Sequence, residues 1–173
     1  MSHTVLVVPV PELEDFVRDR TQHYDPSFVS ADPAFVHAHI TALGPFLDDP
    51  SDSDLEAVGR IAATTPAFAF KLATLGEFPD GTIHLLPEPS EPFARLTRRL
   101  TSAFPHCPPY DGRYPDLVPH VTLDRRSDTV CPDSVRAALS NTVPARCRAD
   151  RIGLHRYANH DCVVLAEWKL CAP

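Results

Sequence analysis

With 173 residues, 43% of them apolar, the chain has the length and composition of one soluble globular domain. Its formal charge of −7 is unevenly spread, because residues 1–70 hold three Lys/Arg against eleven Asp/Glu while residues 71–173 hold thirteen against twelve. Proteins that bind long nucleic acid present a basic face, and this chain has no global signature of one. We therefore exclude long duplex nucleic acid as a partner and expect any nucleic-acid ligand to be a small piece in a local site.

The numbers and positions of cysteine and glycine further restrict the class of protein. The five cysteines form no CxxC pair, and the apolar run near the start is short, broken by Pro9 and without a basic flank. These features favour a cytoplasmic protein with reduced thiols and no contact with a membrane. No paired ligand spacing indicates a zinc site despite nine histidines, and the six glycines form neither GxGxxG nor a P-loop. We expect no metal and no cofactor.

The first half of the chain predicts strand, helix, strand, helix and strand in that order. Pro11 suits the first turn of the first helix, to which Leu13 and Phe16 give an apolar stripe. Ser51 or Asp52 is the expected cap of the second helix. The five predicted elements span residues 3–10, 11–24, 35–46, 50–66 and 67–78.

The second half predicts the same order again. Ser90 is the expected cap of an amphipathic helix in which Phe93, Leu96 and Leu100 share one face. A proline-rich loop then leads into the next strand, and a closing hairpin follows the last helix. The predicted elements span residues 81–89, 90–104, 117–125 and 131–143, with hairpin strands at 145–157 and 161–170.

This recurrence indicates a duplicated unit of about 80 residues. A glycine-bearing strand follows each half's histidine strand, since His39 precedes Gly76 by 37 residues and His120 precedes Gly153 by 33. We therefore predict one domain, residues 1–173, made of two similar lobes (approximately 1–80 and 81–173). Helices would cover the outer faces, and the two histidine strands would face each other across a cleft.

Both histidine strands carry a threonine two residues after the histidine. Strand alternation puts His39 and Thr41 on one side of "FVHAHITALGPF", and His120 and Thr122 on one side of "LVPHVTLDR". About one H-x-[ST] tripeptide is expected by chance, and roughly 0.2 when the second and fourth positions must be apolar. The equivalent positions of the two motifs in the repeat are therefore stronger evidence for a shared site than the residue pattern itself.

This pattern suits metal-free chemistry on a phosphate. Imidazoles titrate near neutral pH, so one can accept a proton while the other donates one. Two of them on opposite sides of a phosphate can activate water and protonate the departing oxygen, and each threonine hydroxyl can hold a non-bridging oxygen. That division of roles is what opening a cyclic phosphodiester requires.

"HITA" at 39–42 and "HVTL" at 120–123 resemble the paired H-h-[ST]-h motifs of the two-histidine (2H) phosphoesterase superfamily, which includes the 2′-5′ RNA ligase-like proteins. The resemblance extends over nearly the whole chain, although Ala42 stands where a bulkier apolar residue is more usual. It implies a bilobal, pseudo-two-fold α/β fold of the α+β type, with two antiparallel sheets around a central cleft. It also implies metal-independent action on cyclic nucleotide phosphates or RNA ends, with His39, Thr41, His120 and Thr122 as the catalytic set.

Further residues near the motifs are candidates for substrate binding. Arg20 and Tyr24 end the first helix and could contact phosphate or stack on a base, and Tyr110 and Arg113 in the proline-rich loop could line the mouth of the cleft. The alternative for each is a surface position. His37 is expected at the rim of the pocket, and a solvated edge is expected for the two arginines after the second motif. No role is predicted for His84, His155 and His160.

The leading hypothesis is a monomeric phosphodiesterase that opens 2′,3′-cyclic or related phosphates on a nucleotide or a short RNA end. The sequence leaves open which histidine is the base and which the acid. One alternative is RNA joining through a 2′-5′ linkage. Another is a non-enzymatic binder of phosphorylated nucleotides or RNA ends. In a third, the histidines are packed in the core and the threonines only favour strand structure.

Overall fold

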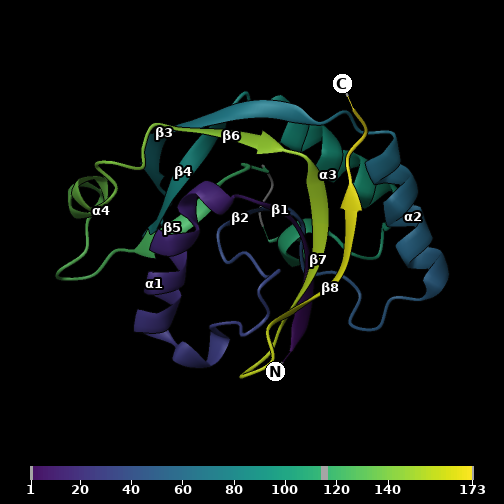
Figure 1. The fold of residues 1–173 in the computed structure, drawn as a ribbon, viewed down its shortest axis with the longest axis horizontal. Helices are drawn as coiled ribbons and strands as arrows, with labels where there is room; N and C mark the ends of the chain where they lie inside the picture. The colour runs from purple at the N-terminus through teal and green to yellow at the C-terminus, as the bar shows by residue number, and fades with distance from the viewer. Residues whose placement is uncertain (1, 114–116, 173) are drawn as a thin grey trace.

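The computed structural model describes residues 2–113 and 117–172, whose strands form one curled antiparallel sheet (Figure 1). This confirms the expected α+β class. The order of strands in the sheet is β6-β3-β4-β5-β2-β1-β7-β8. The strands are β1 (His3–Pro9), β2 (His39–Leu43), β3 (Phe68–Glu77), β4 (Thr82–Glu88), β5 (Val121–Arg125), β6 (Ala145–Ala149), β7 (Arg151–Tyr157) and β8 (Val163–Lys169).

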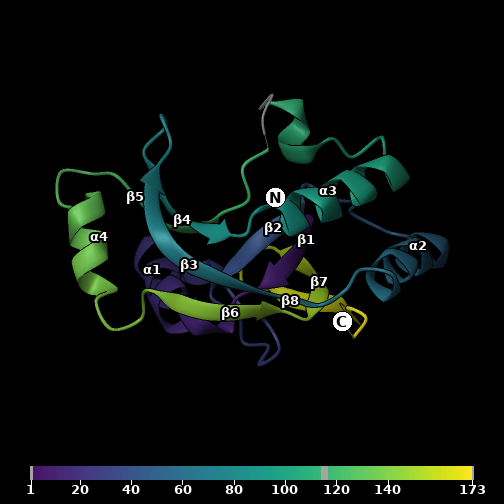
Figure 2. The ribbon, with the colours of Figure 1, turned by 90° about the horizontal axis from the view of Figure 1, so that it is seen from above.

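Four α-helices flank the sheet within the described residues. They are α1 (Glu14–Tyr24), α2 (Asp52–Ala63), α3 (Glu91–Ala103) and α4 (Pro132–Ala138). Helices α2 and α3 lie together at one end of the molecule and α4 lies at the other, while α1 lies beside β5 (Figure 1, Figure 2). Within residues 2–113 and 117–172, no helix combines the length and the apolar character that a membrane crossing requires.

Local sequence explains where the helices begin and end. Ser51 caps α2 in a capping box with Asp54, which decides between the two expected caps. Ser90 is the N-cap of α3, but its side chain makes no capping hydrogen bond. Helix α4 ends at Ala138 rather than at residue 143, because the segment that follows contains Ser, Asn and Thr, which are weak helix formers.

The sheet has two four-stranded halves, and each half combines strands from both halves of the sequence. Strand β3 follows β1 and β2 in sequence but lies with β4, β5 and β6, while β7 and β8 lie with β1 and β2. The sheet therefore does not divide near residue 80, as the expected lobes 1–80 and 81–173 require. The predicted strand 145–157 is likewise two strands, because Asp150 interrupts it and its parts join opposite ends of the sheet.

One face of the sheet and the inner faces of α2 and α3 enclose the core. Fully buried aliphatic side chains come from every part of the sheet, including Leu6, Ile40, Leu72, Leu85 and Ile152. Alternation therefore leaves the other face of β2 and β5, which carries the histidines and threonines of the two motifs, available for a site.

Candidate active site

The two motif strands lie next to each other, not on opposite walls of a cleft as expected. Antiparallel β2 and β5 pair at Ile40 and Val121. Alternation along each strand puts His39 with Thr41, and His120 with Thr122, on the face that lines the cleft. Within the described residues, Ile40 and Val121 are the one registered pair between β2 and β5, so the junction between the two halves of the sheet is short.

A cleft of about 410 Å³ opens over this junction. Both motif histidines and both motif threonines line it, so the structure brings together all four residues predicted as catalytic. Helix α1 forms one side of the cleft and the end of β5 another. The other lining residues include Val17, Arg20, Thr21, Tyr24, Phe28, His37, Thr82, Asp124, Arg125 and Tyr157.

Each motif histidine is held in the same way. The Nδ1–H group of His39 donates to the carbonyl of His37 at 2.7 Å, and that of His120 donates to the carbonyl of Val118 at 2.7 Å. Because a carbonyl can only accept, Nδ1 carries the proton and Nε2 keeps its lone pair. The hydroxyl of Tyr157 also lies 3.3 Å from Nδ1 of His39. Among the described residues neither Nε2 atom has a hydrogen-bond partner, so both are available to a ligand.

Burial disfavours the charged form of both histidine rings. Burial is the main reason that the pKa of His39 is lowered to about 4; the hydrogen bond to the carbonyl of His37 opposes this shift, and the charge of His120 adds to it. Burial also lowers the pKa of His120 from its ordinary value, with a smaller contribution from His84. Both imidazoles are therefore neutral at pH 7, and a bound phosphate would favour protonation of either one.

His37 is not at the rim but is buried, with 5% of its surface exposed, beneath the first motif. Its Nδ1–H group donates to Glu14 at 2.6 Å, and its Nε2 accepts from the backbone N–H of Ser30 at 3.1 Å. The same carboxylate accepts from the N–H of Ala38 at 3.0 Å. Although burial opposes ionisation, these bonds hold the pKa of Glu14 below its usual range. Glu14 thus fixes the backbone whose carbonyl orients His39.

A second histidine lies behind each motif histidine, and no sequence pattern indicated either of them. On β4, His84 stacks on Phe78 with ring centroids 3.8 Å apart and lies 5.4 Å from the ring of His120. A Cβ atom at Gly76 would lie 2.7 Å from Nε2 of His84, so that strand position requires glycine. The pattern of a glycine under a buried ring recurs in the other half of the sheet.

In that half, His155 is 1% exposed and lies against Phe35, with ring centroids 4.4 Å apart. Its ring is 6.5 Å from that of His39, and a Cβ atom at Gly153 would meet its Nε2 at 2.9 Å. Gly76 and Gly153 thus occupy equivalent places in the two halves, as their spacing in the sequence suggested.

Acid should destabilise the fold through His155. Burial lowers its pKa to about 3, and Nδ1 has no partner among the described residues. The unfolded chain binds this proton near pH 6.5 and the folded chain does not, so stability is lost as pH falls below 6.5. We expect His155 to account for about 2 kcal/mol of the loss in unfolding free energy between pH 7 and pH 5.

Urea unfolding of a His155→Phe variant at the two pH values tests this. The variant should lose about 2 kcal/mol less than the wild type on acidification, whatever its stability at pH 7. The matched control is His106→Ala at an exposed histidine, which should lose as much unfolding free energy between the two pH values as the wild type. An unchanged pH dependence in His155→Phe would contradict the burial argument.

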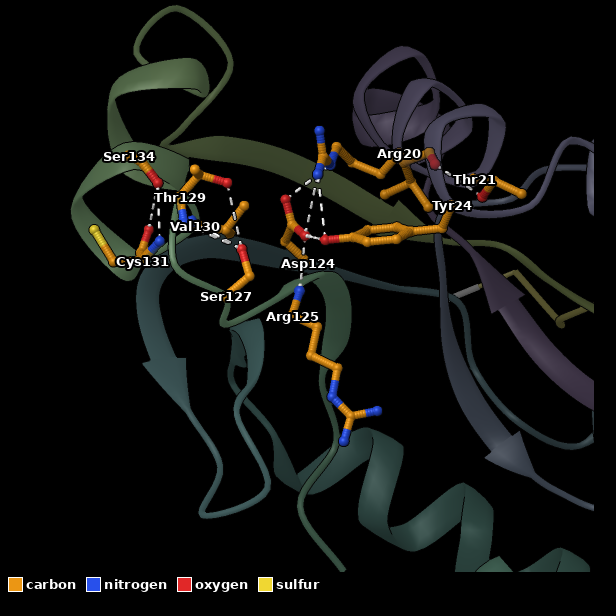
Figure 3. Close-up of polar contacts among 11 residues, drawn as sticks. Arg20, Thr21, Tyr24, Asp124, Arg125, Ser127, Thr129, Val130, Cys131 and Ser134 are labelled. Atoms are coloured by element: carbon orange, nitrogen blue, oxygen red, sulfur yellow. Dashed lines mark hydrogen bonds and ion pairs between the residues drawn. The ribbon is translucent and has the colours of Figure 1, made fainter.

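Two of the four predicted substrate-binding residues line the cleft. Arg20 and Tyr24, from the last turns of α1, meet Asp124 at the end of β5 (Figure 3). Nε of Arg20 lies 2.8 Å from Oδ2 of Asp124, and the hydroxyl of Tyr24 donates to Oδ1. Sequence reasoning missed Asp124, since one aspartate near the end of a strand is not distinctive. Arg125, expected on a solvated edge, also lines the cleft.

The other two predicted binding residues are not among those that line this cleft. The backbone N–H of Tyr110 donates to the carbonyl of Gly44 at 2.7 Å, which holds the proline-rich loop near the end of β2. Arg113 is exposed and lies 3.6 Å from Asp111. A role of Tyr110 or Arg113 at the mouth stays a prediction. Within residues 2–113 and 117–172, no group of three or more His, Cys, Asp or Glu side chains is arranged to hold a metal ion.

Known proteins share the fold of this chain, and a family model covers both of its motifs. The family model described as the 2′-5′ RNA ligase superfamily matches residues 9–161. The chain belongs to the 2′-5′ RNA ligase superfamily. Both H-h-[ST]-h motifs fall within the matched range, so the resemblance seen in the sequence is confirmed.

Solved structures share this superfamily fold. TT0787 of Thermus thermophilus is 19% identical with a TM-score of 0.64, and E. coli LigT, solved with 3′-AMP, is 19% identical with a TM-score of 0.60. A structure described as a phosphoesterase is 18% identical with a TM-score of 0.58. Each comparison covers 98% of both chains. No curated protein matches the chain.

Proposed function

We propose that the protein is a metal-independent phosphodiesterase that opens 2′,3′-cyclic or related phosphates on a nucleotide or a short RNA end. The observation that carries the proposal is the pair of histidines on adjacent strands of one cleft. Each has Nδ1–H fixed by a backbone carbonyl and Nε2 without a partner among the described residues. Two proton-transfer groups so arranged are what a cyclic phosphodiester needs on either side of its phosphorus.

The lower pKa of His39 supports an assignment of the two roles. His39, with a pKa of about 4, stays unprotonated and takes the proton of the attacking water. His120 enters protonated, a state that the substrate's negative charge favours, and donates its proton to the departing ribose oxygen. The new P–O bond comes from water and one P–O bond of the ring breaks. His39 ends protonated and His120 neutral, and proton exchange with solvent restores both.

The threonines complete the site. Thr41 is half-buried and Thr122 is exposed, and both line the cleft together with the two histidines. Their hydroxyls can donate to the non-bridging oxygens, where charge is concentrated in the transition state. One fold relative supports a nucleotide ligand for this site, since E. coli LigT has been solved with 3′-AMP and with ATP.

The pH dependence of kcat/KM should be bell-shaped with its maximum on the acidic side of neutrality. Activity should fall as pH drops through about 4, because His39 must be unprotonated. It should also fall as pH rises through the pKa of His120, which burial lowers below its ordinary value. Initial rates on a 2′,3′-cyclic nucleotide from about pH 3.5 to about pH 9 measure both limbs. A rate that rises steadily to the alkaline end of that range would contradict the assignment.

A screen with chelator present tests the reaction itself. We expect turnover of 2′,3′-cyclic nucleotides, ADP-ribose cyclic phosphate or cyclic-phosphate RNA to persist in excess EDTA. Strict dependence on a divalent metal would end the proposal. Tight binding of these compounds without consumption would instead identify a non-enzymatic binder.

RNA joining is the second candidate, because the matching family model is described by 2′-5′ RNA ligase activity. The same two histidines would serve if a ribose hydroxyl replaced water as the nucleophile. The chain's charge of −7 disfavours a large RNA partner. Incubation with matched RNA halves, one ending in a cyclic phosphate, separates joining from hydrolysis.

A further inference from the structure

The end of α1 presents one aromatic ring to solvent at the edge of the cleft. Tyr24 is 54% exposed, the largest exposed fraction among the large apolar side chains of the described residues. Exposure of an aromatic ring is ordinary when the side chain is free to move. This one is fixed at its far end, because its hydroxyl donates to Asp124 (Figure 3).

Asp124 is a rigid anchor for that hydroxyl. Its side chain is only 4% exposed, and its Oδ1 also accepts from the backbone N–H of Arg125 at 2.8 Å. The Arg20 guanidinium neutralises the carboxylate through Nε at 2.8 Å. The ion pair and these hydrogen bonds hold the carboxylate in place. The ring of Tyr24 is therefore held in place through its hydroxyl group rather than by burial of the ring.

Arg20 also covers one face of the ring. Its guanidinium carbon lies 5.1 Å from the ring centroid of Tyr24 in a cation–π arrangement. The neighbouring His23 makes an inclined contact, with centroids 5.1 Å apart and planes at 72°. With Arg20 committed to Asp124 and to the ring, the exposed part of the Tyr24 ring is the feature of this cluster that is open to a ligand.

We propose that Tyr24 is a stacking platform for the nucleobase of the substrate, held by Asp124 and backed by Arg20. This inference rests on the proposed function for the position of the phosphate between His39 and His120. Tyr24 and the four motif residues line the same cleft. A ligand with its phosphate at the histidines can therefore extend its base along this cleft towards Tyr24. The platform selects nucleotides over other phosphate esters.

Binding of a matched pair of ligands tests the platform. The ligands are adenosine 3′-monophosphate and ribose phosphate, which shares the sugar and phosphate but has no base. Stacking on an aromatic side chain predicts that Tyr24→Ala raises Kd for the nucleotide roughly 5- to 150-fold. Kd for ribose phosphate should stay within about twofold. Tyr24→Phe keeps the ring and loses the anchor, so it should weaken nucleotide binding less than Tyr24→Ala.

The control is Gln22→Ala, at an exposed position of the same helical turn outside the cleft lining, which should bind both ligands like the wild type. Equal changes for both ligands in Tyr24→Ala, no change for either, or a wild type that does not prefer the nucleotide would overturn the platform. Calorimetric binding does not depend on turnover. A wild type that binds with this preference but hydrolyses nothing would end the proposed function and leave the platform intact.

Discussion

Replacing either motif histidine by alanine should lower turnover on the order of 10²–10⁴-fold while the protein stays folded. His39→Ala removes the group that accepts the proton of water, and His120→Ala removes the group that protonates the departing oxygen. Since the two act on opposite sides of one phosphorus, neither can replace the other. Hydrolysis of a 2′,3′-cyclic nucleotide by each purified variant measures the loss.

The variants should fold because both rings face the cleft rather than the core. Circular dichroism and a thermal scan check this. His106→Ala, at an exposed histidine outside the cleft lining, controls for the loss of an imidazole and should keep wild-type turnover. Full activity in a folded His120→Ala protein would contradict the two-histidine mechanism.

Phe93→Ala should lower the free energy of unfolding by about 3–5 kcal/mol. Phe93, on α3, is 3% exposed. Its ring makes edge-to-face contacts with Phe68 at 4.9 Å and Phe70 at 5.0 Å, both on β3. Truncation leaves a cavity where α3 meets the sheet and removes both ring contacts.

Denaturant titration measures that loss, and Phe93→Leu is the matched variant. Leucine keeps part of the buried volume, so it should cost clearly less than alanine. A cost below about 1 kcal/mol for Phe93→Ala would mean that the helix does not depend on this contact.

Periodicity predicted the elements that face a core on one side. The apolar positions of α3 recur at helical spacing, and Phe93, Leu96 and Leu100 are all buried in the structure. The alternation of the two motifs was equally informative, because it put each histidine and its threonine on the cleft face. Each of these features depends on residues within one segment, so it can be recognised from the sequence alone.

Strand partners are not local, and they were predicted less well. Nothing in "ARCRADRIGLHRY" distinguishes one long strand from β6 and β7, whose partners lie at opposite ends of the sheet. The exchange of β3 into the second half has the same origin. Contacts that cross from one element to another, such as Tyr24 with Asp124 or His37 with Glu14, likewise become visible only once the sheet is assembled.

The central claim is that one phosphate contacts both His39 and His120, and nitrogen NMR of the histidine rings tests it most directly. The protein would be labelled with ¹⁵N-histidine and titrated with a nucleoside 2′-monophosphate, and His39→Gln and His120→Gln variants would assign the signals. We predict that the Nε2 signals of both rings shift together, with one ligand per chain, and that both pKa values rise. A shift of only one ring, or of neither at saturation, would contradict the account.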